Sequence, residues 1–263
     1  MQATLPTIDA LIAQGALFVS NHSGGKDSQA TLIELLKRVP KSQIIVVHAS
    51  LGAAEWPGAL EKAQEHAAKH GLPFFVARAN KTIFDMVEHR YATRPSVPSW
   101  PSSSTRQCTS DLKRDPIAKV VRRYAATHGF TTVVNCLGIR ALESTARSKK
   151  NPFSINERFC TNSRDWYEWF PIFELTVAQV KASIAAAGET LHYAYALGND
   201  RLSCVFCIMA STGDLKCGQQ HNPELFNQYV NLEVKTGYTM HASKRSLLEI
   251  VFGQPIMEGA LAA

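Results

Sequence analysis

Hydrophobic residues in the first half of the chain form short continuous runs, separated by longer stretches in which apolar positions recur every three or four residues. Short continuous runs are typical of strands buried on both faces, and the longer spacing is typical of amphipathic helices. The runs that predict strands occupy 16–20, 43–48, 73–77 and 131–137. The stretches that predict helices occupy 29–37, 59–70 and 82–90. This alternation predicts an α/β fold, a parallel sheet with helices on both faces.

The second half is less regular. Three prolines and a serine run at 91–110 predict a long loop, followed by a basic helix at 113–128. An aromatic segment at 166–173 predicts an edge strand, and the region 148–165 is expected to be a loop. Further helices are expected from Thr176 to Gly188, at 223–235 and at 243–251.

Two parts follow from this pattern. We expect an α/β nucleotide-binding domain at 1–190 and a cysteine-bearing helical region at 191–263 packed on it. The basis for a nucleotide site is the turn at 23–28, which joins the first strand to the first helix.

That turn has the sequence Ser-Gly-Gly-Lys-Asp-Ser. Backbone N–H groups in a glycine turn at a helix start can converge on an anion, and the helix dipole favours negative charge there. Lys26 adds a cation, and Asp27 can hold Mg²⁺ or orient the loop. The alternative is a glycine turn that only closes a βα unit. The residues expected to contact a nucleotide are Ser23, Gly24, Gly25, Lys26, Asp27 and Ser28.

A second motif, Gly-x-Arg-x-x-Glu-Ser-x-x-Arg, begins at Gly138, directly after the strand at 131–137. Arg140, Glu143 and Arg147 are three or four residues apart, which predicts one helical face. Two arginines near the carboxyl end of a strand suit a phosphate or sulfate. A solvated helix with an Arg–Glu pair is the alternative.

Six cysteines occur in the chain. Cys204 and Cys207 have Cys-x-x-Cys spacing, Cys217 follows after nine intervening residues, and Cys108 lies in the long loop. Four thiolates can complete an iron–sulfur or zinc site. A redox pair and unrelated core cysteines are the alternatives. The other two cysteines are Cys136, expected to pack in a core strand, and Cys160, whose role stays open.

Together the motifs at 23–28 and 138–147 resemble those of the PP-loop ATP pyrophosphatases, in particular the phosphoadenosine phosphosulfate (PAPS) reductase branch. The resemblance implies a Rossmann-like adenine nucleotide alpha hydrolase fold of the HUP type. It implies binding of ATP with Mg²⁺ and release of pyrophosphate, with Lys26, Asp27 and Arg140 as catalytic residues. It also places His48, at the end of the second strand, near the adenosine, although His48 could equally be a buried core residue.

The segment Cys-Thr-Ser-Asp-Leu-Lys-Arg at 108–114, followed by Cys-x-x-Cys, is similar to the sulfurtransferases of DNA phosphorothioation (the Dnd and Ssp systems). That similarity implies a 4Fe–4S cluster, with zinc as the alternative. Its implied ligands are Cys108, Cys204, Cys207 and Cys217. The chain lacks the Glu-Cys-Gly-x-His tail motif of PAPS reductases and the Cys-Cys pair of APS reductases, which disfavours reduction of a free sulfonucleotide.

The net charge of +6 favours an anionic partner. Basic residues that could contact a nucleic-acid backbone are Lys113, Arg114, Lys119, Arg122, Arg123, Lys149 and Lys150. No run of 18 apolar residues predicts a membrane span, and the absence of a leader-like N-terminus predicts a cytoplasmic protein.

The expected function is ATP-dependent adenylation of an acceptor and sulfur transfer, with a nucleic acid as acceptor and a cysteine desulfurase as a possible sulfur donor. One alternative is a PAPS or APS reductase-like enzyme, and another is a non-catalytic ATP- or DNA-binding subunit. The sequence leaves the sulfur donor and the oligomeric state open.

Overall fold

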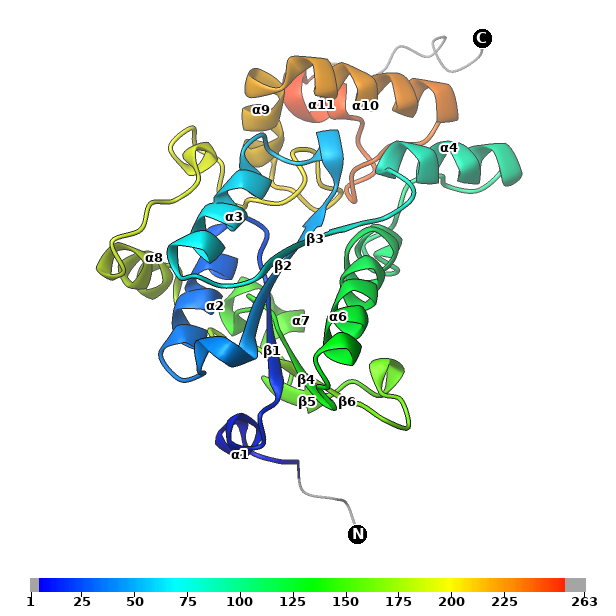
Figure 1. Cartoon of the computed structure of the whole chain (residues 1–263). Coiled ribbons are helices and arrows are strands. Elements are labelled where there is room, and N and C mark those ends of the chain that lie inside the picture. Colours follow the sequence, from blue (N-terminus) through cyan, green and yellow to red (C-terminus); the bar gives the residue numbers. More distant parts are fainter. Residues whose placement is uncertain (1–4, 254–263) are drawn as a thin grey trace. The chain divides into compact units, whose positions relative to one another are not determined.

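A computed structural model describes residues 5–253 (Figure 1). The chain divides into two compact units. Unit 1 comprises the described residues up to Ala49 together with Gly58–Ala77 and Ile117–His192. Unit 2 comprises Ser50–Pro57, Arg78–Pro116 and the described residues from Tyr193 onward. The predicted boundary at residue 190 lies close to the last crossing between the units. The chain also passes from one unit to the other after Ala49, Pro57, Ala77 and Pro116. The composition of the sequence does not indicate these earlier boundaries.

Unit 1 contains a six-stranded sheet with the order β3-β2-β1-β4-β6-β5. The strands are β1 (Leu17–Asn21), β2 (Ile44–Ser50), β3 (Phe74–Arg78), β4 (Thr132–Cys136), β5 (Phe153–Ile155) and β6 (Asp165–Trp169). Strand β1 pairs in parallel with β2 and β4, and β4 pairs in parallel with β6. This mostly parallel sheet confirms the predicted α/β, Rossmann-like class.

Two local predictions were wrong. The aromatic strand β6 is not an edge strand, because β5 pairs antiparallel with it on its outer side. The region 148–165 is not all loop, since it contains β5 and a short 3-10 turn at Glu157–Phe159. Phe153 of β5 stacks on Tyr167 of β6, with ring centroids 5.5 Å apart, so the aromatic pair supports this short strand.

Helices cover both faces of the sheet, as predicted. On one face, Leu11, Leu35 and Ala67, from three different helices, belong to the same buried cluster as Phe18 of β1. On the other face, Val121 and neighbouring residues of one helix pack against the opposite side of β1. The helices of unit 1 are α1 (Ile8–Ala13), α2 (Lys26–Leu36), α3 (Ala59–Lys69), α6 (Asp115–Thr127), α7 (Thr145–Ser148) and α8 (Val177–Ala186). Helix α6 begins at the junction with unit 2.

Helix α2 is the best-buried helix of unit 1. Its inner side packs on the sheet, and Ala30 and Ile33 on another side pack against Val180 and Ile184 of α8. A helix held on two sides presents its first turn in a fixed position, which matters for the loop that precedes it.

Unit 2 is mostly helical. Its helices are α4 (Ile83–Thr93), α5 (Gln107–Thr109), α9 (Thr212–His221), α10 (Pro223–Thr236) and α11 (Leu247–Phe252), with a π-helical turn at Ser110–Arg114. Remaining 3-10 turns of the chain are Lys41–Gln43, Gly52–Ala54, Ala141–Glu143 and Tyr193–Tyr195. The helix predicted to begin near residue 113 therefore begins with an irregular turn.

Tyr229 of α10 lies at the centre of the unit 2 core. Its ring contacts Phe84, Trp100 and Phe206, with centroid distances of 4.9, 5.7 and 5.3 Å. The indole N–H of Trp100 donates to the carbonyl of Tyr238 at 2.9 Å. The long loop predicted at 91–110 is thereby anchored on the C-terminal part of the described chain.

Within residues 5–253, no helix is long and apolar enough to cross a membrane. The tail at 258–263, where the sequence lacks the Glu-Cys-Gly-x-His motif, lies outside the described residues.

Candidate functional site

The glycine turn at 23–28 joins β1 to α2. Gly24 has a φ of +77°, and a Cβ there would lie 2.4 Å from the carbonyl oxygen of Ala59. Only glycine accepts both the left-handed backbone and this close approach without strain. Gly25 follows in an extended conformation as the N-cap residue of α2, and Lys26 begins the helix. The sequence thus places a glycine loop at a helix N-terminus.

Ser23 and Ser28 stabilise the loop through hydrogen bonds within it. Ser28 Oγ donates to the carbonyl of Gly25 at 2.8 Å and accepts from the N–H of Ser23 at 3.1 Å. The two hydroxyls are 3.3 Å apart. Because these contacts fix both ends of the turn, the serines hold the shape of the loop.

Asp27 lies between two cations of the site. Arg140 Nε donates to Asp27 Oδ1 at 2.7 Å, and Lys26 Nζ lies 3.6 Å from Asp27 Oδ2. Lys26 and Arg140 are 4% and 5% exposed, so both charges are largely withdrawn from water. The three predicted catalytic residues therefore form one charged group, in which the two cations are buried and Asp27 is partly exposed.

Gly138 explains how the second motif reaches the first. A Cβ on Gly138 would lie 2.9 Å from both the carbonyl carbon and oxygen of Asp27. The end of β4 therefore runs directly against the first turn of α2, and Arg140 follows two residues later. The structure thus brings the two sequence motifs side by side.

The helical face predicted for the second motif is wrong. Arg140 has an extended backbone, and only short turns follow, at Ala141–Glu143 and in α7. Glu143 Oε2 accepts from the N–H of Arg140 at 3.0 Å and forms an ion pair with Arg147 Nη1. Glu143 and Arg147 thus neutralise each other, and Arg140 alone turns toward Asp27.

His48 is buried beneath the loop. It is 1% exposed, and its Nδ1 lies 2.8 Å from the carbonyl of His22, the residue just before the loop. A carbonyl only accepts, so Nδ1 carries the proton. His48 in this arrangement supports the base of the loop.

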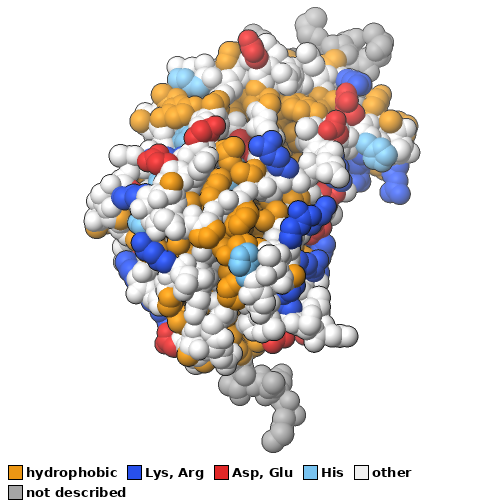
Figure 2. Space-filling view, viewed as in Figure 1, with side chains coloured by type: hydrophobic (Ala, Val, Ile, Leu, Met, Phe, Trp, Pro, Cys, Tyr) orange, Lys and Arg blue, Asp and Glu red, His pale blue; other side chains and the backbone are white. Residues whose placement is uncertain are grey.

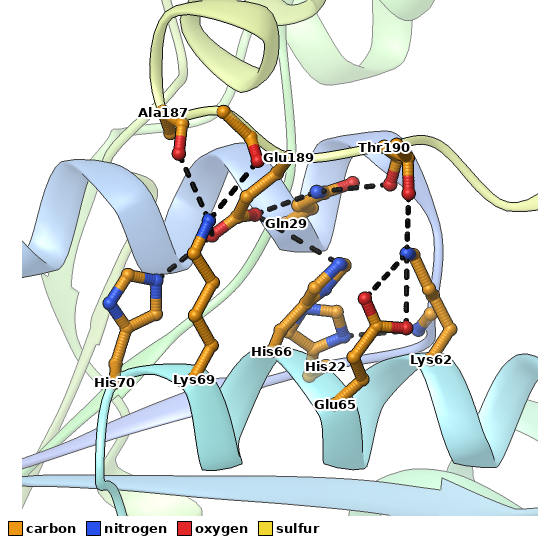
Figure 3. A network of polar contacts seen from close by, with 12 residues as sticks. His22, Gln29, Lys62, Glu65, His66, Lys69, His70, Ala187, Glu189 and Thr190 are labelled. Carbon is orange, nitrogen blue, oxygen red and sulfur yellow. Dashed lines mark hydrogen bonds and ion pairs between the residues drawn. The ribbon is translucent and has the colours of Figure 1, made fainter.

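A chain of histidines that the sequence did not predict leads away from the loop (Figure 3). The N–H of Gly24 donates to His22 Nδ1 at 3.1 Å, which makes Nδ1 an acceptor and leaves the proton on Nε2. His22 Nε2 lies 3.1 Å from His66 Nδ1, so His66 carries its own proton on Nε2. That nitrogen faces Glu189 Oε2 at 3.9 Å. A single backbone N–H thereby sets the tautomer of both rings.

Glu189 anchors the far end of this chain (Figure 3). Its carboxylate accepts from Gln29 of α2 at 2.7 Å, and it lies 2.9 Å from His70 Nε2 and 3.5 Å from Lys69 Nζ. The segment after α8 is therefore fastened to both α2 and α3, the two helices that border the loop.

Burial keeps the two linked rings neutral. The pKa of His22 is lowered well below 6.5, first by burial and then by the nearby His66 and His48. Burial likewise lowers the pKa of His66 to about 4, against the opposing effect of Glu189. Burial raises the pKa of Glu189, but hydrogen bonds from Gln29 and His70 outweigh it, so the net shift is downward. The sequence signals were the His next to the glycine turn and the pair of His four residues apart, His66 in α3 and His70 at its C-cap.

In unit 2, three of the four predicted metal ligands line one small cavity of about 40 Å³, namely Cys108, Cys204 and Cys207. Burial raises the pKa of Cys204 to about 11, although Lys113 opposes this shift. Burial lowers the pKa of Lys113, but the nearby thiols and Glu55 outweigh it and raise the pKa overall. The charge of Lys113 is thus coupled to all three thiols.

The fourth predicted ligand is placed differently. Cys217 Sγ donates to the carbonyl of Leu197 at 3.4 Å, and Cys217 is not part of the cavity wall. Throughout residues 5–253, no three His, Cys, Asp or Glu side chains form a group that could hold a metal ion. The described arrangement therefore does not fit a finished four-thiolate site. The other two cysteines lie in unit 1: Cys136 is fully buried in the core, and Cys160 Sγ accepts from the N–H of Trp166 at 3.3 Å.

A comparison with known protein families shows which family this chain belongs to. The sequence matches the phosphoadenosine phosphosulfate reductase domain over residues 17–210, most of the chain. The chain belongs to the phosphoadenosine phosphosulfate reductase domain family. The match spans both motifs of the loop site and the Cys-x-x-Cys pair, and proteins with this domain include enzymes that act on nucleotides.

Two uncharacterized proteins of Methanocaldococcus jannaschii, MJ0973 and MJ0066, are 23% and 24% identical to 83% and 80% of this chain. The chain spans 48% and 40% of these relatives, less than half of their length.

Among solved structures, PAPS reductase from Candida auris in a phosphate complex is similar, with 16% identity, a TM-score of 0.45, and coverage of 71% of this chain and 80% of that one. FMN adenylyltransferase from Candida glabrata, solved with FAD and pyrophosphate, has 14% identity, a TM-score of 0.44, and coverage of 73% and 55%.

Proposed function

We propose that this protein binds ATP on the loop at 23–28 and adenylates an acceptor with release of pyrophosphate. The observation that carries the proposal is the left-handed glycine loop at the start of α2, next to the charged group of Lys26, Asp27 and Arg140. A fixed helix N-terminus with two adjacent cations suits a polyphosphate.

Each part of the site has a role in this proposal. The N-terminus of α2 offers the positive end of its helix dipole and its first backbone N–H groups to the phosphates. Lys26 and Arg140 neutralise the charge that develops as pyrophosphate leaves. Asp27 holds Arg140 in place through its 2.7 Å bond. ATP enters with its own Mg²⁺ as the substrate complex.

The acceptor supplies an oxyanion oxygen that attacks the α-phosphorus. The bond between the α-phosphorus and pyrophosphate breaks, and the acceptor carries AMP. The persulfide of a donor such as a cysteine desulfurase then attacks the acceptor's phosphorus and displaces AMP, and a thiol reductant cleaves the resulting S–S bond so that one sulfur stays on the acceptor. We infer that the acceptor is a nucleic-acid phosphate, as in DNA phosphorothioation. This finer proposal rests on charge: the chain carries +6 overall, and Lys119, Arg123, Lys149 and Lys150 are exposed on unit 1.

The other basic residues of the 113–128 region contribute less in this proposal. Arg122 lies over the ring of Phe159, 5.3 Å from its centroid, and Arg114 pairs with Asp115. Charge reversal by Lys119→Glu with Arg123→Glu should weaken binding to duplex DNA or tRNA and reduce its salt dependence. Lys41→Glu, another exposed position of unit 1, is the matched control. Equal weakening by the control would contradict a defined basic surface.

Pyrophosphate release tests the central proposal. Lys26→Ala should abolish ATP-dependent release, because its ammonium lies in the first turn of α2. Lys37→Ala is the control: Lys37 lies just beyond the last turn of α2 and is 57% exposed. Wild-type rates in Lys26→Ala protein with an unchanged melting curve would refute nucleotide chemistry at this loop.

A 4Fe–4S cluster on Cys108, Cys204, Cys207 and Cys217 stays a prediction of the sequence, and no step above depends on it. Anaerobically purified protein should then contain about four irons per chain, with loss of iron in Cys204→Ser and retention in Cys160→Ser. If the protein contains one zinc per chain, the alternative metal occupies the site. If it contains no iron and no zinc, the predicted metal site is contradicted.

The match to the PAPS reductase domain supports one second candidate, a reductase of a free sulfonucleotide. Sulfite release from PAPS or APS with a thiol donor, without any nucleic-acid binding at low salt, would establish it. A non-catalytic ATP-binding subunit would bind ATP and release no pyrophosphate.

A further inference from the structure

Besides the small cavity at the cysteines, unit 2 contains a polar pocket that none of the sequence motifs predicted. Its volume is about 610 Å³, within the range of small-molecule sites. One wall is the face of α4, and the other is the segment that leads into α5. The lining residues are Lys81, Asp85, Met86, His89, Arg90, Thr93, Arg94, Ser99, Pro101 and Gln107.

The pocket carries an excess of positive charge. Asp85 is the one carboxylate in its wall, and it accepts from the N–H and hydroxyl of Thr82 at 2.7 and 2.9 Å in the capping box of α4. Lys81 pairs with Asp111 at 2.7 Å. Across residues 5–253, no carboxylate pairs with Arg90 or Arg94. Figure 2 shows Lys, Arg and His side chains gathered where Figure 1 places α4.

Two buried polar atoms in the pocket wall lack hydrogen-bond partners among the described residues. They are Arg90 Nε and Ser99 Oγ, and Ser99 is only 2% exposed. A buried polar group without a partner destabilises the folded state, so each such group calls for an explanation. Arg90 Nε–H can only donate, and Ser99 Oγ–H can donate, so both would be satisfied by one acceptor group.

Gln107 orients the arginine. Its Oε1 accepts from Arg90 Nη1 at 3.4 Å, which leaves Nε and Nη2 for a ligand. A guanidinium offers two parallel N–H groups that match the spacing of two oxygens on a phosphate or sulfate. Met86 and Pro101 add apolar surface beside these donors, suited to the remainder of an organic ligand.

We propose that this pocket binds the oxyanion of a phosphate ester, with Arg90, Arg94 and Ser99 as its contacts. The pocket shares no residue with the loop at 23–28, so it is a second anion site, and its existence does not depend on the proposed adenylation. Free nucleotides and the phosphodiester backbone of a nucleic acid both carry this chemistry. The experiment is arranged to distinguish these two sources.

Binding is measured by isothermal titration calorimetry on Lys26→Ala protein, so that the loop at 23–28 does not contribute. The probes are inorganic phosphate, AMP and a single-stranded DNA hexamer without terminal phosphates. Arg90→Gln and Arg94→Gln should each weaken binding at least tenfold, equal to about 1.4 kcal/mol. Arg201→Gln, an exposed arginine of unit 2 outside the pocket, is the matched control and should leave affinity unchanged.

The variant Ser99→Ala distinguishes a role of Ser99 in ligand binding from a role in the stability of the fold. Removing an unpartnered buried hydroxyl should leave the melting temperature of the free protein unchanged or higher, whereas affinity for the probe should fall several-fold. Tight AMP binding with none by the hexamer identifies a free phosphate ester, and the reverse identifies the nucleic-acid backbone. Absence of millimolar binding by every probe, or equal weakening by Arg201→Gln, would overturn the proposal.

Discussion

Replacing Gly138 with alanine tests whether the end of β4 sets the position of the glycine loop. The new Cβ would lie 2.9 Å from the carbonyl carbon and oxygen of Asp27 and 3.1 Å from the backbone nitrogen of Ser28. Ordinary contact begins near 3.4 Å, so the two backbones must separate by about 0.5 Å. All three neighbouring atoms are main-chain atoms, and no side-chain rotation can relieve the overlap.

The expected loss of stability is about 1–3 kcal/mol, the usual effect of overpacking in a well-packed region. For a protein of this size that corresponds to a melting temperature several degrees lower. Catalysis should suffer more, because the displaced atoms belong to Asp27, which holds Arg140. Since a 1 Å misplacement can reduce a rate about 100-fold, we expect pyrophosphate release to fall at least tenfold.

The assay compares pyrophosphate release and melting temperature for Gly138→Ala and Gly213→Ala. Gly213 lies in the first turn of α9, and a Cβ there would meet only Ser211 Oγ at 3.7 Å. The control should keep full activity and gain up to about 1 kcal/mol of stability from the higher helix propensity of alanine. If Gly138→Ala keeps wild-type release at a wild-type melting temperature, the close approach of β4 to the loop is incorrect.

Three further predictions concern charges. Arg140→Lys keeps the charge but loses the 2.7 Å bond from Nε to Asp27, so pyrophosphate release should fall at least tenfold with little change in melting temperature; unchanged release would exclude Arg140 from the site. Because the folded pKa of His66 is about 4 against 6.5 unfolded, the unfolded chain binds the extra proton first, and the free energy of unfolding should fall as pH drops from about 6.5 to 4. Denaturant titrations across that range should show a shallower fall in His66→Gln, and an identical slope would refute a neutral buried ring. Burial raises the pKa of Glu233 to about 7 from 4.5, so the folded protein holds a proton that the unfolded chain loses, and stability should fall by roughly 3 kcal/mol as pH rises from about 4.5 to 7. Glu233→Gln should remove that loss, and a wild-type pH dependence in the variant would contradict it.

The sheet and the loop could be predicted because their causes are local. Continuous apolar runs identify buried strands, and a glycine pair between a strand and a helix identifies an anion-binding turn. The three-residue strand β5 was missed because its support is the stacking of Phe153 on Tyr167, a contact that depends on the register of the sheet. Spacing alone likewise suggested a helical face for Arg140, whereas its extended backbone follows from the packing of Gly138 on Asp27.

The histidine chain could not be predicted because its members are scattered. His22, His66 and Glu189 come from three distant segments, and only the folded sheet brings them together. The same holds for the pocket beside α4: Arg90 and Ser99, whose Nε and Oγ atoms lack partners among the described residues, look like ordinary helix and loop residues in the sequence.

Unit 2 is assembled from three separate stretches of chain, and this affects the order in which the protein can fold during synthesis. When the ribosome has made residues up to His192, all of unit 1 exists, but Ser50–Pro57 and Arg78–Pro116 still lack the helices that bury them. Trp100 and Phe84 then have no Tyr229 to pack against. A fragment ending near residue 190 should therefore expose aromatic surface and aggregate or bind chaperones. To isolate unit 1, the internal segments Ser50–Pro57 and Arg78–Pro116 must be removed as well as the C-terminal part.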